Sequence, residues 1–451
     1  MRRLWSRLAD ERDDRLTPQA ASFGSRIVAA ALTVTLVYLI LTVTLPFALS
    51  QSSPGVAVSL NDRNPAALIA LADTHRARLI ASLTGDGRLP NAETKATPLS
   101  TEEIERLRAD IQALARRALV SEPLNASAYR LLAETSADAE TIRRHMATAA
   151  RLSRHEAIAH LWLTNDALVR GDIAVVFALG ETLLRTKPEV TDLVVGFLAA
   201  VAETPEGQRR LIERLAAAPP WRKAFLASWP GHFRSTGVPL SVFSALRQTS
   251  RPASPTEVAP YLMHLVRLGN VEQAYAAWLK LVPREMHAKV GLLTNGGFDD
   301  EISILPFDWQ IGQGRNATVE IARSGQPGNQ RWLRISFGHG RVRAPEISQV
   351  LFIGPGRYRL SGRFRPSVVA KRGLRWEITC LSGKQVQLGR TDLLNGNSRS
   401  WRPFDMRFEV PDVPDCKGQR IRAFHDARSA SEEFIEGEVS FDDLTIERTE
   451  P

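Results

Sequence analysis

Hydrophobic and polar residues follow three different patterns along this chain of 451 residues, and each pattern predicts a different kind of structure. Residues 27–49 form an apolar run without one charged residue. From about residue 100 to residue 290, apolar residues recur as they do in packed helices. From residue 291 onward they alternate at every second position, as in half-buried strands. The patterns therefore predict a multidomain chain with one transmembrane helix, an all-α region and an all-β region.

The apolar run reads IVAAALTVTLVYLILTVTLPFAL and is long enough to cross the hydrocarbon core of a bilayer as a helix. Basic residues precede it at Arg2, Arg3, Arg7, Arg12, Arg15 and Arg26, whereas residues 50–60 contain neither Lys nor Arg. By the positive-inside rule, we expect residues 1–26 in the cytoplasm and everything after residue 49 on the other side of the membrane. A cleaved signal peptide is the alternative, although its apolar core is usually shorter and its basic start briefer.

Residues 50–99 are expected to form a polar linker with one helix at about 64–83, followed by an exposed loop. Beyond residue 100 the chain repeats itself. Similar phrases recur at Pro123, Arg154, Pro188, Pro220, Pro252 and Pro283, at intervals of 31 to 34 residues. Within two of these units the helical pattern breaks at Gly171-Asp172 and at Gly269-Asn270. The period predicts pairs of helices, each pair burying its apolar face against its neighbours.

Over residues 100–290 this pattern resembles the tetratricopeptide repeat family, whose unit is a pair of antiparallel helices. The resemblance implies an all-α solenoid with a groove that holds a partner protein. We expect the tryptophans of this region to pack between helices rather than to contact a ligand; they are Trp162, Trp221, Trp229 and Trp278. An irregular all-α domain without a superhelix is the alternative.

Residues 291–451 contain segments such as RWLRISF, RYRLSGRFRP and LRWEITC, which alternate like strands and are separated by Gly-rich turns. This arrangement suits one antiparallel sandwich. NGGFD at 295–299, SQVLFIGPGRYRLSGRFR at 348–365 and VSFDDLTI at 439–446 resemble the galactose-binding-like jelly rolls, and more narrowly the carbohydrate-binding modules. The resemblance implies a jelly-roll sandwich.

In that family, acidic residues near the two ends of the domain often hold a structural calcium. Carried over, the resemblance points to Asp299 and Asp442, with backbone oxygen near Asn295 assisting. Calcium prefers six to eight oxygen ligands. The alternative is that these acids only cap turns.

Sugar recognition uses aromatic faces, because pyranose rings present apolar C–H patches that stack on them. The aromatic candidates of this region are Trp309, Trp332, Trp376, Trp401 and Tyr358. Each of them has core packing as its alternative role, and a fold by itself does not establish a ligand.

Two cysteines, Cys380 and Cys416, are too few for a zinc site without further grouped ligands. On the oxidising side of a membrane a disulfide between them is expected, with two buried thiols as the alternative. The net charge of +9 is spread along the chain and accompanies no nucleic-acid-binding module, so no nucleic acid is expected as partner. No nucleophile, phosphate-binding or metalloprotease motif occurs, so we expect no catalytic residues.

Together these features predict a non-catalytic protein of a Gram-negative-type bacterium, anchored in the inner membrane with most of the chain in the periplasm. The repeats would bind an envelope protein, the sandwich would bind polysaccharide, and the pathway would be cell-envelope or exopolysaccharide assembly or export. One alternative is an envelope hydrolase or lyase acting on glycans. Another is a pure protein-assembly scaffold whose sandwich has no ligand.

Overall fold

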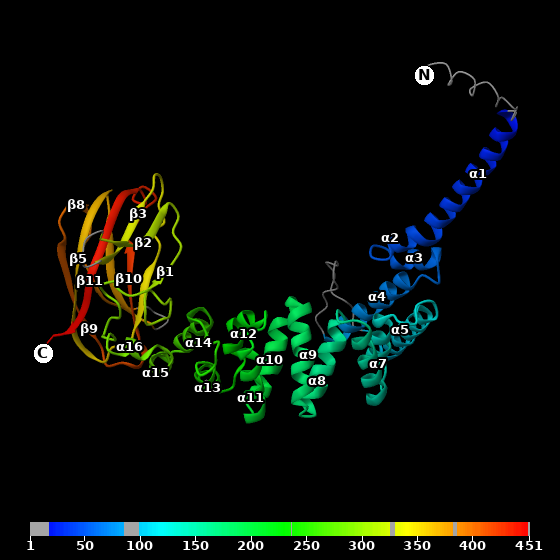
Figure 1. The fold of residues 1–451 in the computed structure, drawn as a ribbon, viewed down its shortest axis with the longest axis horizontal. Coiled ribbons are helices and arrows are strands. Elements are labelled where there is room, and N and C mark those ends of the chain that lie inside the picture. The colour runs from blue at the N-terminus through cyan, green and yellow to red at the C-terminus, as the bar shows by residue number, and fades with distance from the viewer. Residues whose placement is uncertain (1–17, 85–98, 236, 325–329, 382–385, 450–451) are drawn as a thin grey trace, which may run out of the picture. The chain divides into compact units, whose positions relative to one another are not determined.

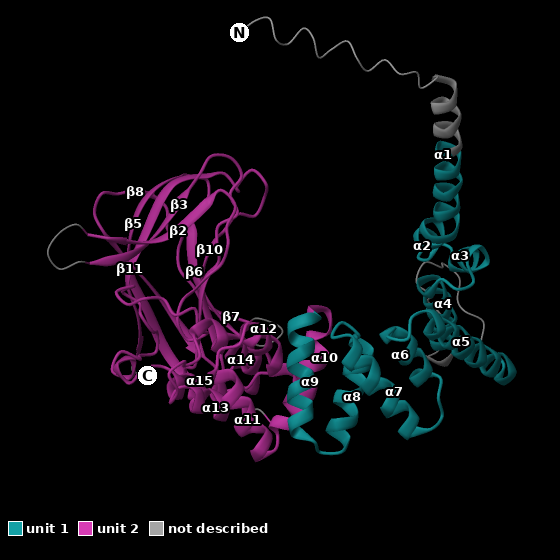
Figure 2. Ribbon diagram, turned by 45° about the vertical axis from the view of Figure 1, so that its right-hand side comes forward, with its two compact units in different colours: residues 1–187 teal, residues 188–451 magenta. Residues whose placement is uncertain are grey.

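The computed structural model describes residues 18–84, 99–235, 237–324, 330–381 and 386–449. They belong to two compact units, residues 1–187 and 188–451, which are described separately (Figures 1 and 2). The first unit is helical, whereas the second begins with helices and ends in a β-sandwich. The predicted order, an apolar helix followed by a helical region and an all-β region, is confirmed. The division between the units lies inside the predicted repeats, and the predicted boundary at 290/291 lies within the second unit.

A long apolar helix opens the described chain. It consists of α1 (Pro18–Leu39), a π-helical turn η1 (Ile40–Thr44) and a short helix α2 (Leu45–Leu49). Among the described residues, Val28–Leu49 is the one helix that is long and apolar enough to cross a membrane. A helix of this kind serves equally as an anchor or as a signal sequence. The arginines predicted to face the cytoplasm, from Arg2 to Arg15, lie outside the described residues.

The end of this helix is tied to the residues that follow it. Pro46 has no N–H and cannot donate to the Thr42 carbonyl one turn earlier, but Asn61 Nδ2 donates to that carbonyl at 2.6 Å. Most residues of the apolar run are exposed on the helix, but Pro46 is buried. Two helices follow, α3 (Pro54–Leu60) and α4 (Pro65–Thr84), where one was predicted. The additional helix α3 begins with Pro54 at a position that suits proline, because no intrahelical N–H is needed there.

Five further helices complete the described part of the first unit. Four of the five begin with a side-chain cap: for example, Ser100 and Glu103 form a capping box, and the Asp172 side chain accepts a hydrogen bond from the Val175 amide. Gly171 adopts a positive φ of 73° between the last two helices, as the predicted break requires. The helices are α5 (Thr101–Ser121), α6 (Ala126–Glu134), α7 (Ala139–Leu152), α8 (Ala157–Val169) and α9 (Ile173–Thr186).

The second unit opens with α10 (Thr191–Ala202), α11 (Pro205–Ala216), α12 (Arg222–Ser228), α13 (Gly237–Leu246), α14 (Pro255–Arg267), α15 (Val271–Leu281) and α16 (Arg284–His287), with the 3₁₀ turns η2 (Pro188–Val190) and η3 (Trp229–His232). Helix pairs recur with the predicted period, since their first helices begin at Ala126, Ala157, Thr191, Arg222 and Pro255. Trp221, Trp229 and Trp278 are buried, which confirms their predicted packing role. Trp162 is partly buried and packs against the core of the first unit. The tetratricopeptide assignment itself stays a prediction.

The sandwich consists of two antiparallel sheets. Strands β1, β4, β10, β6 and β7 form one sheet in that order, and β2, β3, β11, β5 and β8 form the other, with β9 also paired to β5. The strands are β1 (Gln310–Ile311), β2 (Ala317–Arg323), β3 (Arg331–Phe337), β4 (Ile347–Leu351), β5 (Gly356–Ala370), β6 (Leu374–Cys380), β7 (Gln387–Arg390), β8 (Gly396–Asn397), β9 (Arg402–Val410), β10 (Gln419–His425) and β11 (Ile435–Arg448). The predicted alternation is visible in β9, where every second side chain is buried.

The last strand of the described chain lies in the middle of its sheet. β11 pairs with β3 on one side and with β5 on the other (Figure 1). Its pairing with β5 shifts register between Asp442 and Thr445, where Asp443 adopts a positive φ of 52°. This bulge displaces the strand locally from a regular ladder.

One contact closes the sandwich internally, and another links it to the helices of the second unit. A disulfide joins Cys380 at the end of β6 to Cys416 in the turn η4 (Pro414–Cys416), as predicted. Helix α15 packs on loops of the five-stranded sheet, where the Tyr275 ring lies 5.1 Å from Phe307 and 5.4 Å from Phe352. The helical and β parts of this unit therefore share a packed junction.

Candidate functional site

The aromatic residues predicted to bind sugar separate into two groups. Trp309 and Trp376 are 0% exposed and Tyr358 is 4% exposed, all within the core between the sheets. Burial removes these three from contact with any ligand in the folded protein. Trp332 and Trp401 are partly exposed. They remain the aromatic candidates, and their indole rings lie 6.3 Å apart at 80° to each other.

The strand pattern explains why Trp332 faces outward. In β3 the side chains of Leu333, Ile335 and Phe337 belong to the core, so Trp332 and Arg334 point to the opposite face. In β5, Phe364 and Val368 face the core, which places Arg363 and Arg365 on the same outer face. Trp401 comes from the segment that leads into β9. Residues from three separate parts of the chain thus meet on the outer face of the six-stranded sheet.

Arginine side chains cover the two indoles. The guanidinium carbon of Arg365 lies 5.2 Å from the Trp332 ring centre and 4.9 Å from the Trp401 ring centre. Arg363 lies 5.1 Å from Trp401, and Arg334 lies 5.9 Å from Trp332. These separations fall within cation–π range. We call Trp332, Trp401, Arg334, Arg363 and Arg365 the Trp/Arg cluster.

The cluster covers the central strand of its sheet. Ser440 and Asp442 of β11 point to the outer face, yet they are only 1% and 4% exposed. Register explains this burial, because Ser440 lies opposite both Arg334 and Arg365, and Asp442 lies opposite Arg363. The long side chains of the flanking strands therefore form a layer over β11.

Two of the three arginines have acidic partners. Arg363 Nη2 lies 2.7 Å from Asp442 Oδ2 and its Nε lies 2.7 Å from Asp443 Oδ2. Arg334 pairs with Glu320 at 3.1 Å and with Glu438 at 3.7 Å. Within the described residues, Arg365 contacts the two indoles and no carboxylate. Its positive charge is thus held by aromatic faces rather than by a carboxylate.

The residues predicted to bind calcium lie near one another around Gly297, but their oxygens are largely engaged. Asp442 accepts from Arg363 through one oxygen and from the Asp443 amide through the other, and the Asn295 side-chain oxygen accepts from the Asp300 amide. The Asn295 carbonyl accepts from Trp309 Nε1. Because Arg363 engages Asp442 and N–H groups engage the Asn295 oxygens, the Asp299 carboxylate is the predicted ligand that remains, and calcium requires six to eight oxygens. Calcium binding stays a prediction, which these contacts disfavour.

Asp442 is also the buried carboxylate of this region. Burial raises the pKa of the Asp442 carboxyl above its usual value, although Arg363 and the Asp443 amide act in the opposite direction. Among the described residues, no group of three or more His, Cys, Asp and Glu side chains is arranged to hold a metal ion.

A second candidate region lies in the first unit. A cavity of about 330 Å³ is lined by residues of α4, α5, α6, α7 and α8, with Ile80, Met146 and Trp162 among its apolar residues and Arg76 and Glu134 among its polar ones. Its mixed lining suits a side chain of a protein partner.

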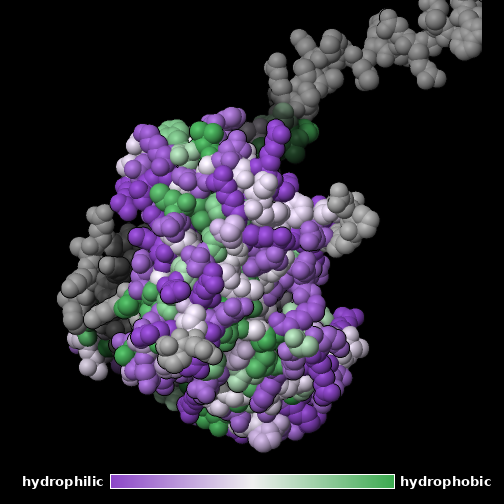
Figure 3. Space-filling model, turned by 90° about the vertical axis from the view of Figure 1, so that its left-hand side faces the viewer, coloured by the Kyte–Doolittle hydropathy of each residue, from purple (hydrophilic) through white to green (hydrophobic). Residues whose placement is uncertain are grey.

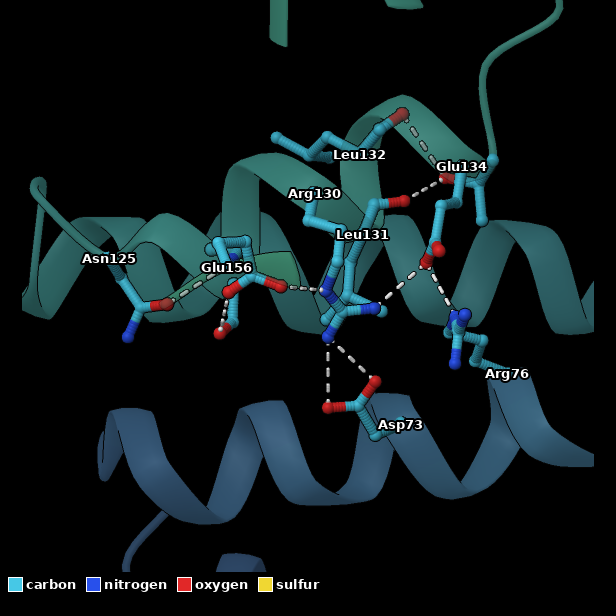
Figure 4. Close-up of polar contacts among 11 residues, drawn as sticks. Asp73, Arg76, Asn125, Arg130, Leu131, Leu132, Glu134 and Glu156 are labelled. Atoms are coloured by element: carbon cyan, nitrogen blue, oxygen red, sulfur yellow. Dashed lines mark hydrogen bonds and ion pairs between the residues drawn. The ribbon is translucent and has the colours of Figure 1, made fainter. Parts of the chain in front are cut away.

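Beside this cavity, Arg130 forms a buried charge cluster (Figure 4). Arg130 is 4% exposed and contacts three carboxylates: Asp73 at 2.8 Å, Glu134 at 2.9 Å and Glu156 at 2.7 Å. Burial lowers the pKa of Arg130, but the three carboxylates outweigh burial and hold it above its usual value. The cluster joins α4 to α6 and to the residue before α8, so its role is structural.

Searches against known proteins found no matching family model and no matching curated protein. Solved structures resemble the sandwich region. A carbohydrate-binding module of family 4 is 17% identical and covers 35% of this chain and 99% of that chain, with a TM-score of 0.26. The family 22 xylan-binding domain from Paenibacillus barcinonensis is 12% identical over 35% of this chain and 93% of that chain, with a TM-score of 0.24. A family 61 module in complex with β-1,4-galactotriose is 17% identical over 36% and 99%, with a TM-score of 0.23.

The arginines of the cluster were not among the residues singled out from the sequence. A signal was present, because RYRLSGRFRP and RWLRISF place arginine at the polar positions of alternating strands. Those segments lie far apart along the chain, and only the pairing of both strands with β11 brings them together.

Proposed function

We propose that this chain is a non-catalytic, membrane-anchored protein of the bacterial envelope, whose sandwich binds glycan and whose helical repeats bind a partner protein. The pathway we propose is assembly or export of a cell-surface polysaccharide. The observation that carries the proposal is the pair of partly exposed tryptophans, Trp332 and Trp401, on the outer face of the six-stranded sheet.

Several features support a polar ligand at this surface. Indole rings offer apolar faces to the C–H patches of a sugar, and arginine N–H groups beside them donate to hydroxyls. Hydrophilic residues predominate on the face of the molecule that Figure 3 shows, with hydrophobic residues in separate patches.

The end of the apolar helix supports a retained anchor. The hydrogen bond from Asn61 to Thr42 and the burial of Pro46 join the helix to α3 and α4. These contacts exist only in a chain that keeps residues 27–49. The Cys380–Cys416 disulfide supports an oxidising compartment for the sandwich.

The test uses the full-length protein in detergent, with affinity electrophoresis through gels that contain bacterial exopolysaccharides. We expect at least one polysaccharide to retard the protein, and the W332A/W401A double variant to lose that retardation. F434A is the matched control, since Phe434 is an exposed aromatic residue outside the Trp/Arg cluster.

Retardation that survives the double variant would contradict the assigned surface. New reducing ends in the same mixtures would contradict the non-catalytic assignment. If no polysaccharide retards the protein while one envelope protein co-purifies with it, the sandwich is a scaffold without a glycan ligand.

A further inference from the structure

The geometry points to a glycan that carries carboxylates, with Arg365 as the residue that binds one carboxylate of an acidic sugar. This inference rests on the proposed glycan-binding function and names the class of glycan. Its basis is a difference among the three arginines: Arg334 and Arg363 pair with carboxylates, whereas Arg365 contacts two indole rings.

Among the described residues, two indole rings hold the Arg365 side chain and no carboxylate does. Its guanidinium carbon lies about equally far from the two ring centres, at 5.2 and 4.9 Å. A cation–π contact engages the charge of a guanidinium group without taking up its N–H donors, and these donors match the two oxygens of a carboxylate. The tryptophans therefore position Arg365 in addition to offering apolar surface to a sugar ring.

Neighbouring charges limit what can approach. Glu320, Glu438 and Asp443 are partly exposed and neutralise Arg334 and Arg363. A dense polyanion would meet these acids at the same time as Arg365, and like charges close together repel. A glycan with one carboxylate per sugar ring presents its charges farther apart, so it suits a single uncompensated arginine surrounded by acids.

Among the described residues, the contacts of α14 and α15 with the sandwich do not involve the Trp/Arg cluster. The contacts described for α14 and α15 with the sandwich involve Gln310, Phe307, Phe352 and Gly418, which belong to the five-stranded sheet or its loops. The Trp/Arg cluster belongs to the other sheet.

The experiment compares two oligosaccharides with the same backbone. Calorimetric titration of the full-length protein in detergent uses oligogalacturonate and its fully methyl-esterified form, which lacks the negative charges. Losing one charge-assisted hydrogen-bonded pair weakens binding by about tenfold or more, so we expect that difference between the two ligands. R365A is expected to weaken oligogalacturonate binding to a similar degree, and R365K is expected to restore only part of it, because lysine lacks the planar fork.

R420A is the matched control, since Arg420 lies on the five-stranded sheet and pairs with Glu346.

Equal binding of the acid and its ester by the wild-type protein would overturn the inference, while the proposed glycan binding would stand. Binding of polyglutamate as tight as that of oligogalacturonate would also overturn it, because the surface would then recognise negative charge whether or not a sugar carries it. If neither these oligosaccharides nor any exopolysaccharide binds, the proposed function fails as well. The comparison of the two ligands needs no variant, so a misfolded R365A would not prevent the test.

Discussion

Single arginines that are buried or half-buried each hold more than one carboxylate in this molecule. Arg130 is surrounded by three carboxylates in the first unit, and Arg363 contacts two in the second. The desolvation of such a group is offset only while its partners remain in place. Removing the arginine therefore leaves buried negative charge without compensation, which costs more than the loss of an exposed ion pair.

Substituting Arg130 tests this reasoning. R130A is expected to destabilise the helices around it by about 3–5 kcal/mol, because Asp73, Glu134 and Glu156 would face one another without a cation. Hydrogen exchange of the α6 amides in the full-length protein measures this free energy locally. R106A is the control, because the exposed pair of Arg106 with Glu102 contributes about 0.5 kcal/mol or less. Unchanged protection of α6 in R130A would show that the cluster is not structural.

At the scale of elements, the junction between the apolar helix and α3 depends on one unusual hydrogen bond. Pro46 withholds an N–H from the Thr42 carbonyl, and Asn61 supplies a donor from another part of the chain. The π-helical turn η1 lies at the same place. Irregular turns of this kind are common where a helix must accommodate an inserted group.

This junction gives a prediction with a built-in rescue. N61A is expected to destabilise the junction by about 1–3 kcal/mol, since it removes the donor to a partly buried carbonyl. Adding P46A restores an N–H one turn after Thr42, so the double variant is expected to recover much of the loss. Hydrogen exchange of α3 in nanodiscs measures both effects. If the double variant is less stable than N61A, then Asn61 does not compensate for the N–H that Pro46 lacks.

At the scale of elements, the predicted strands and helix breaks can be compared with those of the structure. The segments RWLRISF, RYRLSGRFRP and LRWEITC, predicted as strands, lie within β3, β5 and β6, because a strand pattern is a local property of the sequence. In β6 nearly every side chain is buried, so burial there does not alternate. The breaks at Gly171 and Gly269 appear between helices as expected, since both residues adopt positive φ. Helix α3 was missed because seven residues are too few to show a helical period.

The candidate site was predicted only in part, for a physical reason. A tryptophan in a strand can face the core or the solvent, and the choice depends on the register of that strand. Trp332 alternates with Leu333 and Ile335, which face the core, but Trp376 itself faces the core. The partnership of Arg365 with two indoles requires the pairing of distant strands, and no local pattern encodes it.

For the whole molecule, the decisive property is the side of the membrane on which the two units lie. The basic N-terminal segment and the disulfide support export of everything after residue 49. We expect alkaline phosphatase fused after Pro451 to be active in a bacterial host, and β-galactosidase at the same position to be inactive. The reverse pair of activities would place both units in the cytoplasm and would remove the basis for the proposed function.

The position of β11 has a consequence for how the chain matures. A chain that leaves the ribosome or a translocon starts from its N-terminus, so Ile435–Arg448 arrives after every other strand. Until then β3 and β5, which flank it, have an empty slot between them, and the six-stranded sheet exists as two unjoined halves. A prematurely ended product would therefore display open strand edges on β3 and β5, which favour aggregation and proteolysis.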